Sequence, residues 1–534
     1  MTEKYKDFLR LVIYQVYPRS FQDTNHDGIG DIQGIIQRLD YIKSLGANAI
    51  WIGPCYKSPN DDNGYDISDY RDIMDEFGTL DDIKELISEM HKRDMKLIMD
   101  LVPNHTSTEH IWFQESRKSK DNPYSDYYYW FDAPPNDWES CFSGSAWEYD
   151  EVRGQYYLHS YAISQADLNW NNPKVVKEMQ DIVDYWIELG VDGFRCDVID
   201  QISKDFENNV NSFGPRLHEF IHALFGRENT KKIFTIGECW CDSVEELCKH
   251  TGADRGELST VFQFDHLDCG REGKWLPRKA DLREARDILL KWGQVSAENE
   301  LLHTLFTDNH DNSRFINRVT NNSPLRYEAA SCIATMVYFM KGIPVIYQGQ
   351  EFGTMAPYYD SMEQFDDVES KNFYKEFCAS MTSEEAIRRI NFGSRDNNRR
   401  PMCWDNSQYG GFSDTRPWIA VHNEVKKINL EADTNSEKSV FKYYQKLLNF
   451  RKTSEAILDG SLEVLSNEED KYFAYIREFG MEKILVVCNF EERMKISAFD
   501  MDGDLVLNNY ATRTVPNGWY EPYETAVFRL SAKE

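Results

Sequence analysis

The sequence predicts an α/β fold, a (β/α)8 TIM barrel with a B subdomain inserted after the third strand and a C-terminal antiparallel β-sandwich domain. Short apolar segments alternate with helical segments eight times over the first two-thirds of the chain. A polar stretch rich in tyrosine and tryptophan interrupts the alternation, and closely spaced short strands end the sequence. Eight alternating units suit a closed parallel barrel better than an open sheet.

The predicted barrel strands are apolar runs, each followed by polar or helical sequence. They are residues 11–18, 47–53, 96–102, 191–198, 233–239, 259–264, 303–308 and 343–348. Helical segments separate most of them, as the connections between parallel neighbours require.

Three predicted helices have distinct features. Residues 31–45 are predicted to form one helix. Thr79, with Asp82 three positions later, resembles a capping box at a helix start. Asn172-Pro173 places a capping residue before a proline at the first helical position, and Gly190 is expected to end that helix.

Composition and pattern divide the chain into three parts. The barrel is expected at residues 1–105 and 172–457, the inserted domain B at 106–171 and the C-terminal β domain at 458–534. A second polar excursion, residues 353–429, follows the eighth strand. Strands of the last domain are expected at 462–465, 472–477, 484–490 and 525–530.

The composition limits the classes of partner. The chain has 534 residues, with 60 Lys and Arg against 90 Asp and Glu, a formal charge of −30, and 14% aromatic residues. Phosphate surfaces repel such a protein, so we expect neither a nucleic-acid nor a membrane partner. The many aromatic side chains suit a cleft for a small oligosaccharide. Met1–Arg10 is charged and has no apolar segment, which predicts a cytoplasmic protein without a secretory signal. We expect a monomer or weak dimer.

The eleven cysteines are scattered along the chain. They form no Cys-x-x-Cys pair and no zinc-like spacing with histidine. Cys239 and Cys241 are separated by one residue, which is too close for a usual metal-binding pair. We therefore expect reduced thiols in a cytosol.

Acidic residues follow the ends of the predicted strands, several of them beside a histidine or an arginine. Residues at the carboxyl ends of barrel strands converge on one mouth, where the chemistry of such folds takes place. The residues in question are Asp100, His105, Arg195, Asp197, Glu238, His310 and Asp311.

Three convergent carboxylates suit the hydrolysis of a glycoside. Arg195 lies two residues before Asp197, so both side chains face the same side of the strand, and its charge should keep Asp197 ionised as a nucleophile. Glu238 has no adjacent cation in the sequence, which suits a protonated acid/base. We expect the two carboxyl groups about 5–5.5 Å apart, the spacing of a retaining enzyme.

The segments DLVPNHTS, GFRCDVID, TIGEC and FTDNHD, in this order, resemble the four signature regions of the α-amylase superfamily of glycoside hydrolases (family 13). QADLNW resembles the fifth region of its oligo-1,6-glucosidase and α-glucosidase subgroup, with Ala166 where proline is usual. DNGYDISDY and SRDNNRRPMCWD also resemble that subgroup, with Cys403 where glutamine is usual. The resemblance covers nearly the whole chain and implies a retaining, exo-acting α-glucosidase that releases glucose from isomaltose, panose and other short α-1,6-linked glucosides.

The resemblance implies roles for the matching residues. Asp197 would be the nucleophile, Glu238 the acid/base and Asp311 the stabiliser of the transition state. The subsite for the non-reducing glucose would be completed by His105, Arg195 and His310.

Further positions of the resemblance concern specificity. Tyr65 would stack on the glucose, and Asp66 with Arg399 would close the pocket behind it. Val198 matches enzymes that prefer α-1,6 links. Trp240 departs from the subgroup, where a small residue is usual, and could narrow or stack the leaving-group subsite.

One acidic stretch near the start of the chain has the pattern of a cation loop. Asp23, Asn25, Asp27 and Asp31 place oxygens at alternate positions, with the Ile29 carbonyl as a fifth ligand. The subgroup resemblance implies a structural Ca²⁺ distant from the chemistry; Mg²⁺ and an Asx-rich turn without metal stay open. No organic cofactor is expected.

Other activities of the same fold stay open. These are an α-1,4-glucosidase or sucrose hydrolase, and a trehalose-6-phosphate hydrolase, which needs a basic pocket for its phosphate. A sucrose isomerase is disfavoured, because an RLDRD-like stretch is expected after the NHD motif and residues 312–318 read NSRFINR. A non-catalytic relative, like the transporter-associated heavy chains, is disfavoured because all three carboxylates are present.

Overall fold

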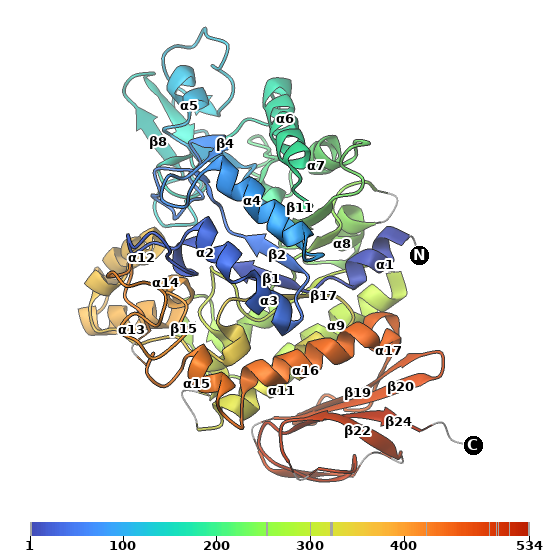
Figure 1. Ribbon diagram of the computed structural model, residues 1–534. Helices are drawn as coiled ribbons and strands as arrows, with labels where there is room; N and C mark the ends of the chain where they lie inside the picture. Colours follow the sequence, from blue (N-terminus) through green and yellow to red (C-terminus); the bar gives the residue numbers. More distant parts are fainter. Residues whose placement is uncertain are drawn as a thin grey trace.

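The computed structural model describes residues 3–531, except 253–254, 300, 321–323, 423, 491, 498, 500 and 512. Residues 1–2 and 532–534, the outermost parts of the predicted first and last domains, lie outside the described residues. Figure 1 shows the barrel at the centre, with β8 (Trp147–Asp150) and α5 (Ile111–Ser116) at one end and the C-terminal sheet at the other. The exact limits of the three domains stay predictions.

Eight strands form one parallel sheet that curls into a barrel, which confirms the predicted fold class. In spatial order they are β13 (Thr260–Val261), β12 (Phe234–Gly237), β11 (Gly193–Cys196), β5 (Lys96–Leu101), β2 (Ala49–Ile52), β1 (Ile13–Val16), β17 (Ile343–Tyr347) and β16 (Thr304–Leu305). The two outer strands approach each other through Thr304, whose hydroxyl donates to the carbonyl of Val261 at 3.3 Å. Each predicted strand contains one of these strands but is longer, because its end residues belong to the loops at the two rims.

Two helix starts have the expected caps. Thr79 and Asp82 exchange hydrogen bonds as a capping box at the start of α4 (Leu80–His91). Asn172 caps α6 (Pro173–Leu189), which ends at Gly190 with a φ of 106°. Only a residue that tolerates the left-handed region fits there easily, so glycine ends this helix.

The prediction of one helix over residues 31–45 was wrong. The chain forms α2 (Ile32–Gln37) and α3 (Leu39–Leu45), separated at Arg38. The Arg38 guanidinium donates to Gln22 Oε1 at 2.6 Å and lies 4.0 Å from the centre of the Trp404 ring. These contacts hold the break in place against the barrel.

The inserted region after β5 carries small antiparallel sheets. One sheet has the order β7 (Trp130–Phe131), β9 (Gln155–Leu158), β8, and another pairs β10 (Gln165–Asp167) with β6 (His105–Ser107). Nearby, β3 (Tyr56–Lys57) pairs with β4 (Asp69–Ile73), and beyond β13 the chain pairs β14 (Arg271–Glu272) with β15 (Leu276–Pro277).

The C-terminal part contains a five-stranded antiparallel sheet and a two-stranded ribbon. The sheet has the order β18 (Ser461–Val464), β19 (Tyr472–Phe479), β20 (Glu482–Asn489), β24 (Thr525–Leu530), β22 (Gly503–Asn508). The ribbon pairs β21 (Met494–Ile496) with β23 (Gly518–Tyr520). Sequence reasoning missed β21, β22 and β23, because β21 and β23 are only three residues long and β22 has a single fully buried residue.

The remaining helices surround the barrel or join it to the C-terminal sheet (Figure 1). They are α1 (Glu3–Leu9), α7 (Leu217–Phe225), α8 (Val244–Thr251), α9 (Leu282–Asn299), α10 (Phe315–Thr320), α11 (Arg326–Tyr338), α12 (Val368–Cys378), α13 (Ser383–Gly393), α14 (Asp396–Arg399), α15 (Leu430–Thr434), α16 (Val440–Thr453) and α17 (Glu455–Asp459). Every residue of α11 from Glu328 onward is buried, because this helix packs against α16 on one side and against β20 on another.

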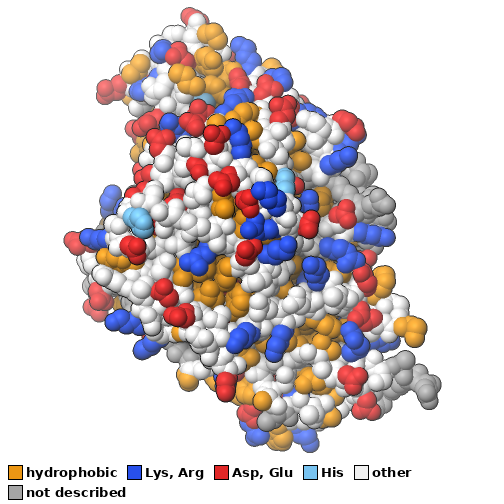
Figure 2. Space-filling view, viewed as in Figure 1, with side chains coloured by type: hydrophobic (Ala, Val, Ile, Leu, Met, Phe, Trp, Pro, Cys, Tyr) orange, Lys and Arg blue, Asp and Glu red, His pale blue; other side chains and the backbone are white. Residues whose placement is uncertain are grey.

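On the face drawn in Figure 2, acidic and basic side chains are interspersed. Among the described residues, no helix combines the length and the apolar character needed to cross a bilayer.

Candidate active site

The register of three neighbouring strands brings the predicted acidic residues to one rim of the barrel. Arg195 on β11 lies opposite Asp100 on β5, and Cys196 lies opposite Gly237 on β12. The residue after Cys196 at the end of β11 is Asp197, and the residue after Gly237 at the end of β12 is Glu238. The two carboxylates therefore begin adjacent loops at the same level of the barrel.

A single buried guanidinium joins three carboxylates at this rim. Arg195 Nη1 donates to Asp100 Oδ1 at 2.8 Å and to Asp197 Oδ1 at 2.7 Å, and its Nη2 donates to Glu238 Oε2 at 2.5 Å. The contact with Asp197 agrees with the two-residue spacing that places both side chains on one side of the strand. The structure thus brings together the predicted nucleophile, the predicted acid/base and Arg195.

The expected electrostatic division between the two carboxylates needs correction. Arg195 does not serve Asp197 alone, and Glu238 does have a cation as a neighbour. Burial raises the pKa of Asp197 well above its ordinary value; the Arg195 guanidinium opposes this rise, and the charges of Glu238 and Asp100 add to it. Burial likewise raises the pKa of Asp100 to about 6. Because one positive charge cannot balance three negative charges, two of them buried and one half-buried, this cluster retains a proton readily.

Val198 lies beyond the end of β11, and its backbone has φ 35° and ψ 46°. The prediction of a strand through this residue was wrong, since β11 ends at Cys196. A left-handed conformation is costly for a β-branched residue. It aims the Val198 N–H at Glu238 Oε2, 3.1 Å away, so the strained turn holds the predicted acid/base.

Asp311, the third of the predicted catalytic carboxylates, lies beside two arginines. Arg399 Nη2 donates to its Oδ1 at 3.1 Å, and Arg395 Nη1 lies 3.7 Å from the same oxygen. Burial opposes ionisation, but the neighbouring His310 ring and the charges of Arg399 and Arg395 outweigh it and lower the pKa of Asp311 far below its ordinary value. This carboxylate is therefore ionised near neutral pH.

His310 connects the two sides of the rim. Its Nδ1 lies 2.9 Å from the amide nitrogen of Gln15, which donates to it, so the ring proton is on Nε2. Nε2 lies 2.5 Å from the Tyr65 hydroxyl and 3.0 Å from Asp311 Oδ2. Tyr65 donates in turn to Asp100 at 3.1 Å, and its ring stacks on His310. Burial lowers the pKa of His310 to about 3, so the ring is a neutral connector.

His105 lies at the neighbouring edge of the rim. Its Nε2 is 3.2 Å from the amide nitrogen of Gln165 on β10, and its ring lies 5.3 Å from that of Tyr161. Burial lowers its pKa to about 4, so it is neutral near pH 7. A neutral imidazole can donate to a sugar hydroxyl.

The expected pair of Asp66 and Arg399 was wrong. The Asp66 carboxylate accepts from the Ser58 hydroxyl at 3.0 Å and from the backbone N–H groups of residues 61 and 62, so it stabilises its own loop. Arg399 is directed to Asp311. The ion pair between these two segments is formed instead by Asp62 Oδ1 and Arg395 Nη2, 2.8 Å apart.

Trp240 lies two residues beyond Glu238 and remains 53% exposed. Its ring stacks on Phe264, with ring centres 4.3 Å apart and an angle of 20° between the planes. An exposed aromatic face held rigidly in this way can pack against a sugar ring.

The cation loop presents the oxygen donors that a hard cation prefers, and hydrogen bonds within the loop engage these oxygens. Asp23, Asn25 and Asp27 each accept a hydrogen bond from backbone N–H groups inside the loop. Asp31 also caps α2, where it accepts from Gly34 N–H at 2.7 Å. A cation bound by these oxygens and by the carbonyl of Ile29 would compete with the internal hydrogen bonds.

Sequence reasoning missed four residues that support the rim. Gln15 orients His310, Trp51 donates to Asp100 at 3.1 Å, and Asp62 with Arg395 forms the ion pair described above. Asp62 and Arg395 belong to the segments NDDNGYD and SRDNNRR, whose charges were a usable signal. Gln15 and Trp51 lie within apolar strands, and nothing in the sequence around them indicates a role at the rim.

The comparisons with known proteins agree with this geometry. Residues 15–460 match the model of the α-amylase catalytic domain. The chain is 46% identical to an oligo-1,6-glucosidase of Parageobacillus thermoglucosidasius over 91% of this chain and 90% of that one. It is 43% identical to the Bacillus cereus oligo-1,6-glucosidase over 97% and 98%. A solved trehalose-6-phosphate hydrolase of Bacillus licheniformis is similar with a TM-score of 0.93 and 38% identity, over 98% of this chain and 100% of that one. The chain therefore belongs to the α-amylase family of glycoside hydrolases.

Proposed function

We propose that this protein is a retaining, exo-acting α-glucosidase that releases glucose from short α-1,6-linked glucosides such as isomaltose and panose. The observation that carries the proposal is Arg195, which joins Asp197 and Glu238 through its two terminal nitrogens. Retention requires two close carboxyl groups, one ionised and one protonated. The names of the two oligo-1,6-glucosidase relatives support the linkage.

The reaction proceeds in two displacements. Asp197 attacks the anomeric carbon and forms a glycosyl–enzyme bond while the glycosidic bond breaks, and Glu238 gives its proton to the leaving oxygen. Glu238 then takes a proton from water, whose oxygen displaces Asp197 and gives glucose of unchanged anomeric form. Asp311, ionised beside Arg399, stabilises the positive charge that develops on the sugar ring.

The exo-action follows from the ion pair of Asp62 and Arg395. Both side chains are buried, and Arg395 also lies 2.6 Å from Asp367 and 4.6 Å from the centre of the Phe142 ring in the inserted region. This pair takes the place that we expected for Asp66 and Arg399. A chain end fits against such a closed wall, whereas a polymer cannot pass through it.

A trehalose-6-phosphate hydrolase is the second candidate, because a solved protein of that name is similar to this chain. Such an enzyme needs unpaired cations. A cavity of about 1170 Å³ has six arginines and lysines in its lining, which includes none of the proposed catalytic residues. Four of these six have an acidic partner: Arg278 pairs with Glu284, Arg283 with Asp281, Arg388 with Glu385 and Lys471 with Glu492. A fifth, Arg318, donates to the backbone carbonyls of Leu267 and Ser313. Cations already paired bind phosphate weakly, which favours the unphosphorylated substrates.

The test is a hydrolysis panel with the full chain. Initial rates are measured on isomaltose, panose, maltose, sucrose, trehalose and trehalose-6-phosphate, and the anomer first released is identified by proton NMR. We expect the highest kcat/KM for isomaltose or panose and α-glucose as the first product. A higher kcat/KM on trehalose-6-phosphate would select the second candidate, and β-glucose would reject the double displacement.

The proposal includes a structural Ca²⁺ held by Asp23, Asn25, Asp27, Ile29 and Asp31, in a cytoplasmic monomer or weak dimer. Ca²⁺ should raise the thermal midpoint of the protein, and the variant Asp27→Ala should lose that response. An unchanged midpoint in the wild type would leave the loop as an Asx-rich turn. Light scattering on a sizing column measures the assembly.

A further inference from the structure

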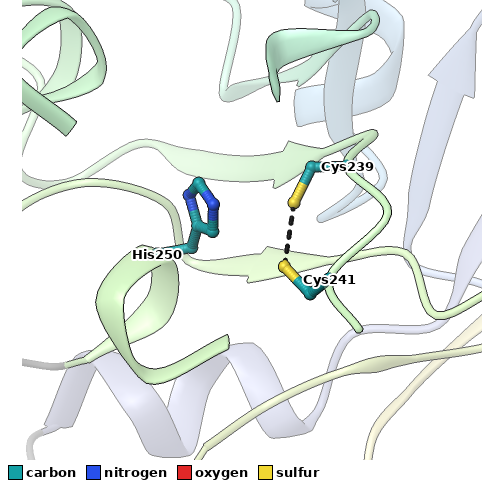
Figure 3. Close-up of side chains that lie close together, drawn as sticks. All are labelled: Cys239, Cys241 and His250. Carbon is teal, nitrogen blue, oxygen red and sulfur yellow. Dashed lines mark hydrogen bonds between the residues drawn. The ribbon is translucent and has the colours of Figure 1, made fainter. Parts of the chain in front are cut away.

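The loop that follows β12 gathers two cysteines and a histidine beside the proposed acid/base. Cys239 directly follows Glu238, Cys241 lies two residues further on, and His250 comes from α8. Figure 3 shows the three side chains gathered around one small space. The two sulfur atoms are 3.1 Å apart, and one ligand atom from each of the three residues lies within 4.8 Å of the others.

All three side chains are buried, and one ring nitrogen of the histidine has no hydrogen-bond partner among the described residues. Their exposed fractions are 0%, 2% and 0% for Cys239, Cys241 and His250. Nδ1 of His250 has no hydrogen-bond partner within the described part of the chain, and Nε2 has only the Glu246 carboxylate, whose Oε1 lies 3.4 Å away. A buried polar atom without a partner costs free energy, so this ring indicates a ligand that completes its bonding.

We propose that Cys239, Cys241 and His250 bind a zinc ion. Two thiolates and an imidazole nitrogen are a usual zinc ligand set, with bonds of about 2.3 Å to sulfur and about 2.0 Å to nitrogen. Zn²⁺ displaces the two thiol protons, which pass to solvent, and His250 binds through a neutral ring nitrogen. No electron is transferred. The one-residue spacing of the cysteines alone argued against a metal; the histidine supplied from α8 supports one.

A neighbouring group of possible ligands is already satisfied. His218 and Glu257 also lie close to His250, but His218 Nδ1 is 2.7 Å from Glu257 Oε2, within hydrogen-bond distance. The side of His250 that faces the cysteines therefore offers the better site. Zinc there ties α8 to the strand end that carries Glu238, and it fixes the loop that presents Trp240.

The test measures metal directly rather than activity. The full chain is purified without chelator, its zinc content is determined by mass spectrometry, and the reduced apoprotein is titrated with Co²⁺. We expect about one zinc per chain, and thiolate-to-cobalt absorption that saturates at about one ion per chain. Cys241→Ser and His250→Ala should weaken Co²⁺ binding at least about tenfold.

The matched control is Cys332→Ala, because Cys332 lies beside Cys488 in a second buried pair of cysteines. It should bind zinc and Co²⁺ like the wild type. Reduced wild-type protein that binds neither metal would overturn the proposal even if the variants fail to fold. Equal zinc in the Cys241→Ser protein would also overturn it. A third result would also overturn it: freshly purified protein that contains no zinc and shows nine free thiols after denaturation in place of eleven, because two missing thiols identify a disulfide.

Discussion

Replacement of Arg195 by methionine should shift the pH dependence of hydrolysis. The nucleophile must be ionised, and Arg195 opposes the rise in the pKa of Asp197 that burial causes. An adjacent guanidinium lowers the pKa of a carboxyl by about 1–3 units, so its loss should raise the pKa of Asp197 by a similar amount. Activity falls as pH decreases through that pKa. Each unit by which this pKa rises lowers the ionised fraction of Asp197 tenfold at a pH below the pKa. On the acidic side of the pH profile, kcat/KM should therefore fall about 10- to 1000-fold.

The assay is kcat/KM for isomaltose between about pH 4 and 9, where the pKa values of free-enzyme groups determine the profile. In the wild type the acidic limb should lie above about pH 4, the ordinary value for aspartate. Arg195→Lys, which keeps the charge, should shift the limb less. Arg451→Met is the control, since that buried guanidinium donates to the carbonyls of Tyr338, Met340 and Gly342, remote from the rim. An identical acidic limb in the wild type and the Arg195→Met protein would refute the reasoning.

Three further changes test other parts of the structure. Asp62→Asn removes the charge that holds Arg395 and should raise the KM for isomaltose about 10- to 100-fold, since a hydrogen bond to a charged group contributes about 1.5–3 kcal/mol. An unchanged KM would show that this ion pair does not close the pocket. Val198→Thr should shift the ratio of kcat/KM for maltose over isomaltose upward by up to about tenfold; a constant ratio would place linkage preference elsewhere. Thr79→Ala breaks a capping box far from the rim and should lower the free energy of unfolding, measured in urea, by about 1 kcal/mol at unchanged kcat. Thr79→Ser keeps the capping hydroxyl and should retain most of that free energy. Equal losses in both variants would exclude the cap as the cause.

The barrel strands and the three carboxylates could be predicted because their signals are local. A buried parallel strand is a short apolar run, and a residue just beyond it lies at the rim whatever the rest of the chain does. The period of two along a strand was enough to place Arg195 beside Asp197. These inferences needed no knowledge of distant segments.

Partners that come from distant segments could not be predicted in the same way. Asp62 and Arg395 are 333 positions apart, and the choice among the acidic residues of one loop depends on how that loop turns. Asp66 was the wrong choice because backbone N–H groups of its own loop occupy its oxygens, which only the folded turn reveals. The pKa of Asp197 was misjudged for a related reason, since the sequence shows one neighbouring arginine but not the two other carboxylates that share it.

The same distinction applies to the cysteines next to Glu238. Read along the chain, Cys239 and Cys241 are too close to each other, and His250 follows Cys241 by nine residues, so the usual spacing of a metal site is missing. His250 becomes a neighbour only because α8 returns to the end of β12. Two contacts then hold the region of Glu238. The Val198 N–H donates to Glu238 itself, and Cys239, the next residue, contacts Cys241 in the group of two cysteines and His250. A metal bound there would therefore restrict the residue next to the proposed acid/base, in addition to the hydrogen bond from the strained turn.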